Sequence, residues 1–258
     1  MTVLASPARR AMGATTRSRT GALVMQTDYV LTSTSTWVCS VLGVLVCGVL
    51  ATLYMLMTAR GGDSGASNLE IGFTATSVLV LAAMISGCVI GSQEWGSGQH
   101  LYVFTAVPRR SALLAARWGV VAVVWFVTGC AAGLVVVAAN RLLGGSAPPA
   151  TAATIWLVAG TGLAAAQAAV IGVNIATLLH STVLSVVATV ALVSLVPVLT
   201  ALQPGLHRLL PTTSLAALSS LPTHGADGAS LTTALLVTLT WTGLSAAAAS
   251  VRLTRSDL

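Results

Sequence analysis

Four charged residues lie close together between Gln93 and Trp118, in a sequence that is otherwise strongly apolar: Glu94, Arg109, Arg110 and Arg117. A carboxylate and three guanidinium groups can pair with one another, with acidic residues of a partner protein, or with lipid phosphates. The sequence shows no set of residues for hydrolysis or zinc binding, because there is no His-Glu-x-x-His or Gly-x-Ser-x-Gly motif and the four histidines are scattered. These are His100, His180, His207 and His224.

Composition limits the elements that can position these charges. The chain has 258 residues, of which 55% are hydrophobic and 7% charged, and its mean hydropathy is +0.91. Soluble domains carry about 25% charged residues, so this chain cannot cover a water-facing surface. Its apolar runs approach the roughly 20 residues that cross a bilayer as a helix. We therefore expect an all-α integral membrane protein with no sizeable soluble domain.

Six apolar runs predict six transmembrane helices, near residues 37–57, 71–91, 118–139, 154–178, 182–202 and 230–251. The Arg-containing residues 1–20 are interpreted as a mobile cytoplasmic tail. Residues 21–258 then form a single six-helix transmembrane domain, in which 21–36 is an interfacial segment. The proline-containing linker 203–229 is expected to form short outer helices. Close helix packing within one subunit is predicted by small residues spaced four apart: Gly87 and Gly91, Gly129 and Gly133, and a row on the fourth span.

The distribution of arginine sets the orientation. With an even number of spans and a cytoplasmic N-terminus, nine arginines fall on the inner side and only Arg60, Arg141 and Arg208 on the outer side. Both termini and the 93–117 segment are therefore predicted to face the cytoplasm. The arginines are dispersed beside the spans, which favours contact with membrane lipids over binding of nucleic acid. The chain contains no Lys, so it cannot hold a Walker-A phosphate loop.

The charged segment resembles a known pattern. Glu94, Trp95, Gly98 and Pro108-Arg109-Arg110 are similar to the E-[YW]-x-x-G…V-P-R-R pattern that follows the second span of type-2 ABC exporter permease subunits of high-GC bacteria. In that family the segment forms a short cytoplasmic coupling helix, expected here over about 94–107, which docks on a separate ATPase. The resemblance assigns ATPase coupling to the following residues: Glu94, Trp95, Gly98, Pro108, Arg109, Arg110 and Arg117.

The resemblance also implies an assembly. Two six-span subunits, identical or paired with a related permease, would associate with two copies of an ABC ATPase in the bacterial plasma membrane. The ATPase would bind ATP and Mg, while this chain would be non-catalytic and bind no cofactor or metal. The exported substrate would be an amphipathic drug, a peptide or a lipid. In the family, spans 1, 2 and 5 flank the central path, so the resemblance suggests that Thr74, Ser77 and a helix break at Pro197 line it.

Two polar residues on the fourth span leave alternatives open. Gln167 and Asn174 lie seven residues apart on one helix face, where they can contact substrate or form interhelical hydrogen bonds. In the alternative interpretation, the 93–117 segment is an ordinary cytoplasmic loop whose arginines only set the orientation of the protein in the membrane. The carboxylate of Glu94 is expected to pair with a nearby Arg or to accept hydrogen bonds from backbone N–H groups at a helix start. The alternative function is an ATPase-independent transporter, channel or immunity protein with six spans.

Overall fold

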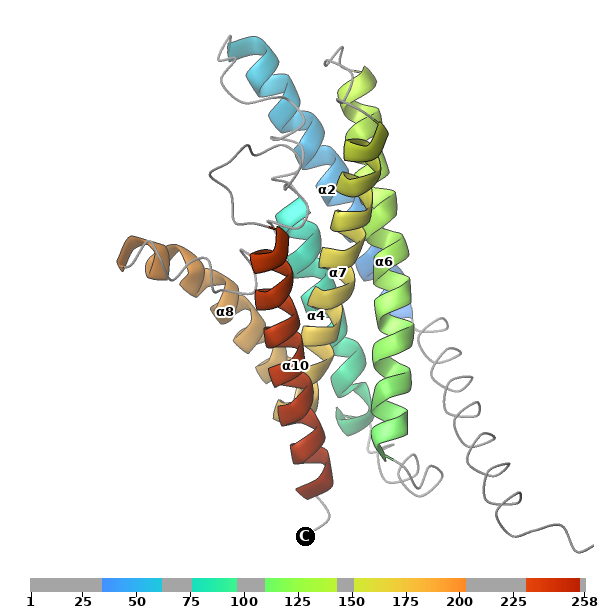
Figure 1. Ribbon diagram of the computed structural model, residues 1–258, viewed down its shortest axis with the longest axis vertical. Coiled ribbons are helices and arrows are strands. Elements are labelled where there is room, and N and C mark those ends of the chain that lie inside the picture. The colour runs from blue at the N-terminus through green and yellow to red at the C-terminus, as the bar shows by residue number, and fades with distance from the viewer. Residues whose placement is uncertain (1–33, 62–75, 97–109, 143–150, 203–230, 256–258) are drawn as a thin grey trace, which may run out of the picture.

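The computed structural model describes residues 34–61, 76–96, 110–142, 151–202 and 231–255 (Figure 1). Within these ranges every residue except His180 and Ser181 is helical, and no strand is present. The helices are α2 (Thr34–Gly61), α4 (Thr76–Gly96), α6 (Arg110–Leu142), α7 (Thr151–Leu179), α8 (Thr182–Leu202) and α10 (Leu231–Arg255). The all-α prediction is confirmed for these residues. The expected tail 1–20, most of the interfacial segment 21–36 and the outer helices within 203–229 lie outside them.

Three helix boundaries differ from the sequence-based expectation. α4 continues through Glu94 and Trp95 to Gly96, so these residues form its last turn and do not begin a separate coupling helix. α6 starts at Arg110 instead of near Trp118, because Pro108 precedes it and its first two turns are rich in Ala and Leu, which favour helix. The break expected at Pro197 is absent, since α8 continues to Leu202. A proline removes one backbone hydrogen bond, and a transmembrane helix can tolerate that loss.

The helix α7 occupies the centre of the bundle. It packs against α4, α6, α8 and α10, while α2 packs against α4 and α6. Figure 1 shows α4, α6, α7 and α10 running roughly along one axis, with α8 slanting away from them. The buried fraction of the membrane-spanning stretch is highest in α7 and lowest in α10. The core is therefore formed mainly between α4, α6 and α7.

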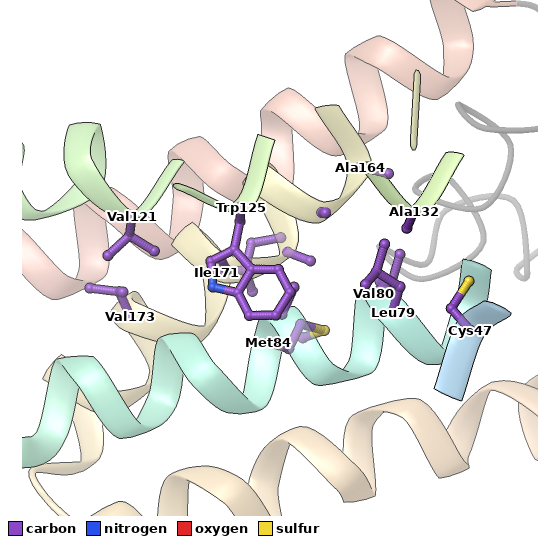
Figure 2. Close-up of a cluster of buried hydrophobic side chains, with 14 of the residues drawn as sticks. Cys47, Leu79, Val80, Met84, Val121, Trp125, Ala132, Ala164, Ile171 and Val173 are labelled. Atoms are coloured by element: carbon purple, nitrogen blue, oxygen red, sulfur yellow. The ribbon is translucent and has the colours of Figure 1, made fainter. Parts of the chain in front are cut away.

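A tryptophan fills the space between these three helices. Trp125 of α6 is fully buried and lies beside Met84 of α4 and Ile171 of α7 (Figure 2). Its indole N–H donates a hydrogen bond to the hydroxyl of Ser86, 3.3 Å away on α4. A buried indole needs such a partner, because an unsatisfied donor in an apolar interior is costly. Trp125 thus supplies both the largest packing surface and one polar link between α6 and α4.

Glycine residues bring the core helices together at two crossings. A Cβ at Gly87 of α4 would collide with the carbonyl oxygen of Ala169 on α7, and one at Gly172 of α7 would collide with that of Met84 on α4. At the second crossing, a Cβ at Gly129 of α6 would lie 2.7 Å from the Cα of Gly162 on α7. The prediction that the small-residue rows mark packing within one subunit is confirmed.

Five helices are long and apolar enough to cross a membrane: Thr36–Leu53, Thr76–Gln93, Ser111–Leu142, Thr154–Leu179 and Thr233–Arg252. Large apolar side chains are exposed along α2, α6, α8 and α10, as expected for surfaces that face lipid. These features indicate a multi-pass membrane protein. In α8 the apolar stretch whose side chains are described, Thr182–Ser194, is shorter than a full span.

Candidate functional site

The charged segment singled out in the sequence joins two helices at one end of the bundle. We call this end, where α4 ends, α6 begins and α7 turns into α8, the Trp95 end. Gly98, Pro108 and Arg109 lie outside the described residues. Glu94 and Arg110 are described by their backbone alone, in the last turn of α4 and at the first residue of α6.

The expectation that Glu94 sits at a helix start is wrong. Its backbone lies near the C-terminus of α4, where the unsatisfied carbonyl groups carry partial negative charge. The last turn of α4 holds no basic residue. The expected pairing of Glu94 with a nearby Arg stays a prediction, because the side chain of Glu94 lies outside the described part of the structure.

Two side chains at the end of α4 hold the turn between α7 and α8. The ring centroids of Trp95 and His180 are 3.9 Å apart, with an interplanar angle of 43°. One turn earlier, the hydroxyls of Ser92 and Thr182 form a hydrogen bond of 2.7 Å. Ser92 is fully buried. The end of α4 and the start of α8 are therefore joined by a ring contact and a hydrogen bond.

The turn itself is tight and has a defined geometry. His180 has a positive φ of 53°, in the left-handed region that non-glycine residues rarely adopt. Its N–H donates to the carbonyl of Ala176 at 2.9 Å. Ser181 then caps α8, because its hydroxyl accepts from the N–H of Leu184 at 3.4 Å. The two-residue connection forces α7 and α8 to run in opposite directions, as the sequence predicts.

Arg117 lies inside the Trp95 end. Only 5% of its surface is exposed, and its guanidinium Nη1 is 3.5 Å from the carbonyl oxygen of Gly91 on α4. A cation beside the carboxyl-terminal turns of a helix is favoured by the helix dipole. Arg117 thus contacts α4 from α6, and its burial leaves little of the side chain to reach a partner protein.

The two amides of α7 have different surroundings. Asn174 is fully buried, accepts a hydrogen bond of 2.8 Å from the indole of Trp118 on α6, and donates one of 2.9 Å to the hydroxyl of Ser245 on α10. Of the two alternatives left open for Asn174, the structure shows the interhelical hydrogen bonds. Gln167 is half-buried, and its buried carbonyl oxygen has no hydrogen-bond partner.

Of the other residues suggested for a substrate path on the first, second and fifth spans, the described one, Ser77, does not lie near Asn174. Ser77 is exposed near the opposite end of α4, fifteen residues before Ser92, or roughly 20 Å along the helix axis. Thr74 and the side chain of Pro197 lie outside the described residues. An apolar groove of about 260 Å³ does lie between α2 and α4, lined by Cys39, Leu42, Gly43, Val46, Val78, Leu81, Ala82 and Ile85. No charged residue lines it.

Several contact residues were missed by the sequence analysis. Ser92, Trp118 and His180 make contacts between helices, but each was treated as an ordinary residue of a span or a loop. Part of this could have been predicted from spacing. Cys88 and Ser92 lie four residues apart, and Thr182 and Ser185 three apart, which places each pair on one helix face.

Comparison with known proteins does not assign the chain to a family. No protein-family model matches the sequence, and a search of curated proteins gives no significant match. Within the described residues, no group of three or more His, Cys, Asp or Glu side chains could hold a metal ion. The arguments for function therefore come from the sequence pattern and from the contacts at the Trp95 end.

Proposed function

We propose that this chain is the transmembrane permease subunit of an ABC exporter in a bacterial plasma membrane. It would have six spans with both termini in the cytoplasm, α8 being the fifth span. Two such subunits, identical or related, would assemble with two copies of a separate ATPase that binds ATP and Mg. This chain would be non-catalytic, and the assembly would export an amphipathic drug, peptide or lipid-like molecule.

One observation carries most of the proposal. The segment that resembles a coupling helix connects α4 to α6 at the Trp95 end, where Trp95, Ser92 and Arg117 link α4 to the α7–α8 turn and to α6. A displacement applied to the 97–109 segment would therefore act on four helices together.

The charge distribution favours the proposal over an ion-coupled carrier. Among the side chains that the structure describes, Arg117 is the one charged group that is buried. Proton- or ion-coupled carriers usually need several ionisable groups inside the membrane. An external energy source such as a partner ATPase fits this arrangement better.

Co-purification is the first test of the proposal. A tagged chain expressed in its own membranes should bring down an untagged Walker-A protein. Glu94→Ala combined with Arg109→Ala should lower ATP-dependent export of a fluorescent amphipathic dye by about tenfold, which lies within the range typical of a lost coupling between two sites. The control is Arg141→Ala, which removes an exposed arginine at the opposite end of α6 and should leave export unchanged.

The opposite result would favour the alternative function. If the chain purifies alone and moves the dye without nucleotide, it is an ATPase-independent transporter or channel. The same conclusion would follow if the double variant exported dye as well as the wild type does.

A further inference from the structure

The helix α8 is attached to the bundle differently from the other helices. In its described part, 182–194, the only buried side chains are those of Ser185 and Thr189, and both are fully buried hydroxyls. Each of the other described helices buries at least one apolar side chain in the core. Four large apolar residues of α8 are exposed, namely Val183, Leu184, Val187 and Val190, while Leu192 and Val193 pack against the core only in part.

Polar groups on α4 face these two hydroxyls. The thiol sulfur of Cys88 lies 3.2 Å from the hydroxyl of Thr189 and 3.7 Å from the carbonyl oxygen of Ser185. One turn further along α4, the hydroxyl of Ser92 bonds that of Thr182. We call these five residues the polar seam: Cys88, Ser92, Thr182, Ser185 and Thr189.

A seam of this kind holds two helices weakly in a membrane. Apolar side chains gain little by packing against a helix when the alternative is lipid, and a thiol is a weak hydrogen-bond donor. The hydroxyls of the seam also have other partners: that of Ser92 reaches the carbonyl of Cys88, and that of Ser185 reaches the carbonyl of Ser181, each on its own helix. Opening the seam would therefore leave these groups at least partly satisfied.

The contrast with α7 shows which helix can move. α4 and α7 meet through backbone contact at Gly87 and Gly172, an arrangement that any separation would disrupt. α8 has no such contact on α4, and it already slants away from the other helices (Figure 1). Its start is held by the capped turn at His180 and Ser181, which can act as a pivot.

We infer that α8 separates from α4 along the polar seam, pivoting at the α7–α8 turn, and exposes Cys88, Ser185 and Thr189 to water. This opening is a property of the chain itself and needs no ATPase. The surface it uncovers carries hydroxyl and thiol groups within an otherwise apolar bundle. The seam is thus a conformational device that lets water, or the polar part of a molecule, reach the side of α4.

The rate at which Cys88 reacts in membranes tests this inference. A charged, water-soluble methanethiosulfonate reagent is added to vesicles that contain the full chain and no nucleotide, and labelling is quantified by peptide mass spectrometry. Thr189→Val removes one hydroxyl from the seam while keeping its shape. Labelling of Cys88 should then accelerate about threefold, the change expected for the loss of one average interhelical hydrogen bond in a membrane.

Matched controls separate seam opening from other causes. Thr240→Val removes an exposed hydroxyl that bonds the carbonyl of Leu236 on its own helix, and should leave the rate at Cys88 unchanged. Cys47, equally buried on α2, should stay unlabelled in every variant. In a Cys88→Ser background, Ser185→Cys should label too, because opening exposes both sides of the seam.

Three results would overturn the inference. Thr189→Val could leave the rate at Cys88 unchanged, Cys47 could react as fast as Cys88, or Ser185→Cys could remain protected while Cys88 reacts. Because the labelling is done without nucleotide, the outcome is independent of the co-purification experiment that tests the proposed function.

Discussion

Single residues set how closely the core helices approach. At Gly172 and Gly87 the backbones of α4 and α7 leave no room for a Cβ, while at Gly119 and Gly243 an added Cβ would meet no atom within 4 Å. All four glycines lie in helices, so propensity alone ranks them equally. Their positions in the packing therefore decide what a substitution does.

We expect Gly172→Ala to lower the free energy of unfolding by about 1–3 kcal/mol, the usual cost of overpacking a core. Gly119→Ala is the matched control and should be neutral, or stabilising by up to about 1 kcal/mol through helix propensity. Thermal unfolding in detergent, followed by circular dichroism, measures both. Equal effects of the two substitutions would show that α4 and α7 do not pack as closely as described.

Asn174 and Gln167 provide a second comparison on one helix face. Asn174→Leu leaves the indole of Trp118 without its acceptor and removes the bond to Ser245, so we expect a loss of about 1–2 kcal/mol in unfolding free energy. Gln167→Leu removes a carbonyl oxygen that has no partner, and should be neutral or stabilising. If the two variants melt alike, the hydrogen bonds of Asn174 do not stabilise the bundle.

At the scale of elements, the α7–α8 hairpin depends on one residue in an unusual conformation. His180→Asn should keep the turn, because Asn tolerates a positive φ. His180→Val places a β-branched residue there and should cost about 1–3 kcal/mol more. Both variants lose the ring that contacts Trp95, so the difference between them reports the backbone conformation. It is measured as the difference between their unfolding temperatures in detergent.

The helices themselves were largely predictable, whereas their exact ends were not. Within the part of the chain that the structure describes, apolar runs located all six helices, and the two-residue connection at His180 and Ser181 predicted the α7–α8 hairpin. The extension of α4 to Gly96 was missed because the polarity of Gln93 and Glu94 suggested a loop. Helix formation continues past the apolar limit when the last turn is held by contacts such as Trp95 with His180, which a one-dimensional pattern does not contain.

The candidate site was predictable only in part, for a related reason. Charge and spacing drew attention to Glu94 and Arg117, because ionisable groups are rare in this chain. They could not show that Arg117 is buried against α4, since burial depends on how helices far apart in sequence pack. Uncharged contacts such as that between Ser92 and Thr182 were missed because hydroxyls are common throughout the chain.

For the whole molecule, the proposed orientation makes a prediction about access. Ser181→Cys in the α7–α8 turn should react with an impermeant thiol reagent only after cells are permeabilised. Arg141→Cys, at the opposite end of α6, should react in intact cells, because the arginine distribution places that end outside. Labelling of Ser181→Cys in intact cells would reverse the orientation and remove the basis for contact with a cytoplasmic ATPase.

The length of α6 has a consequence for the surrounding lipid. Its apolar stretch of 32 residues is about 48 Å long, whereas the hydrocarbon layer of a bilayer is about 30 Å thick. Such a mismatch is relieved by helix tilt, by local thickening of the bilayer, or by a protruding end. Because α6 is packed closely against α7, a change in its tilt moves the centre of the bundle. The acyl-chain length of the host membrane therefore acts on the same helices that the proposed partner would move.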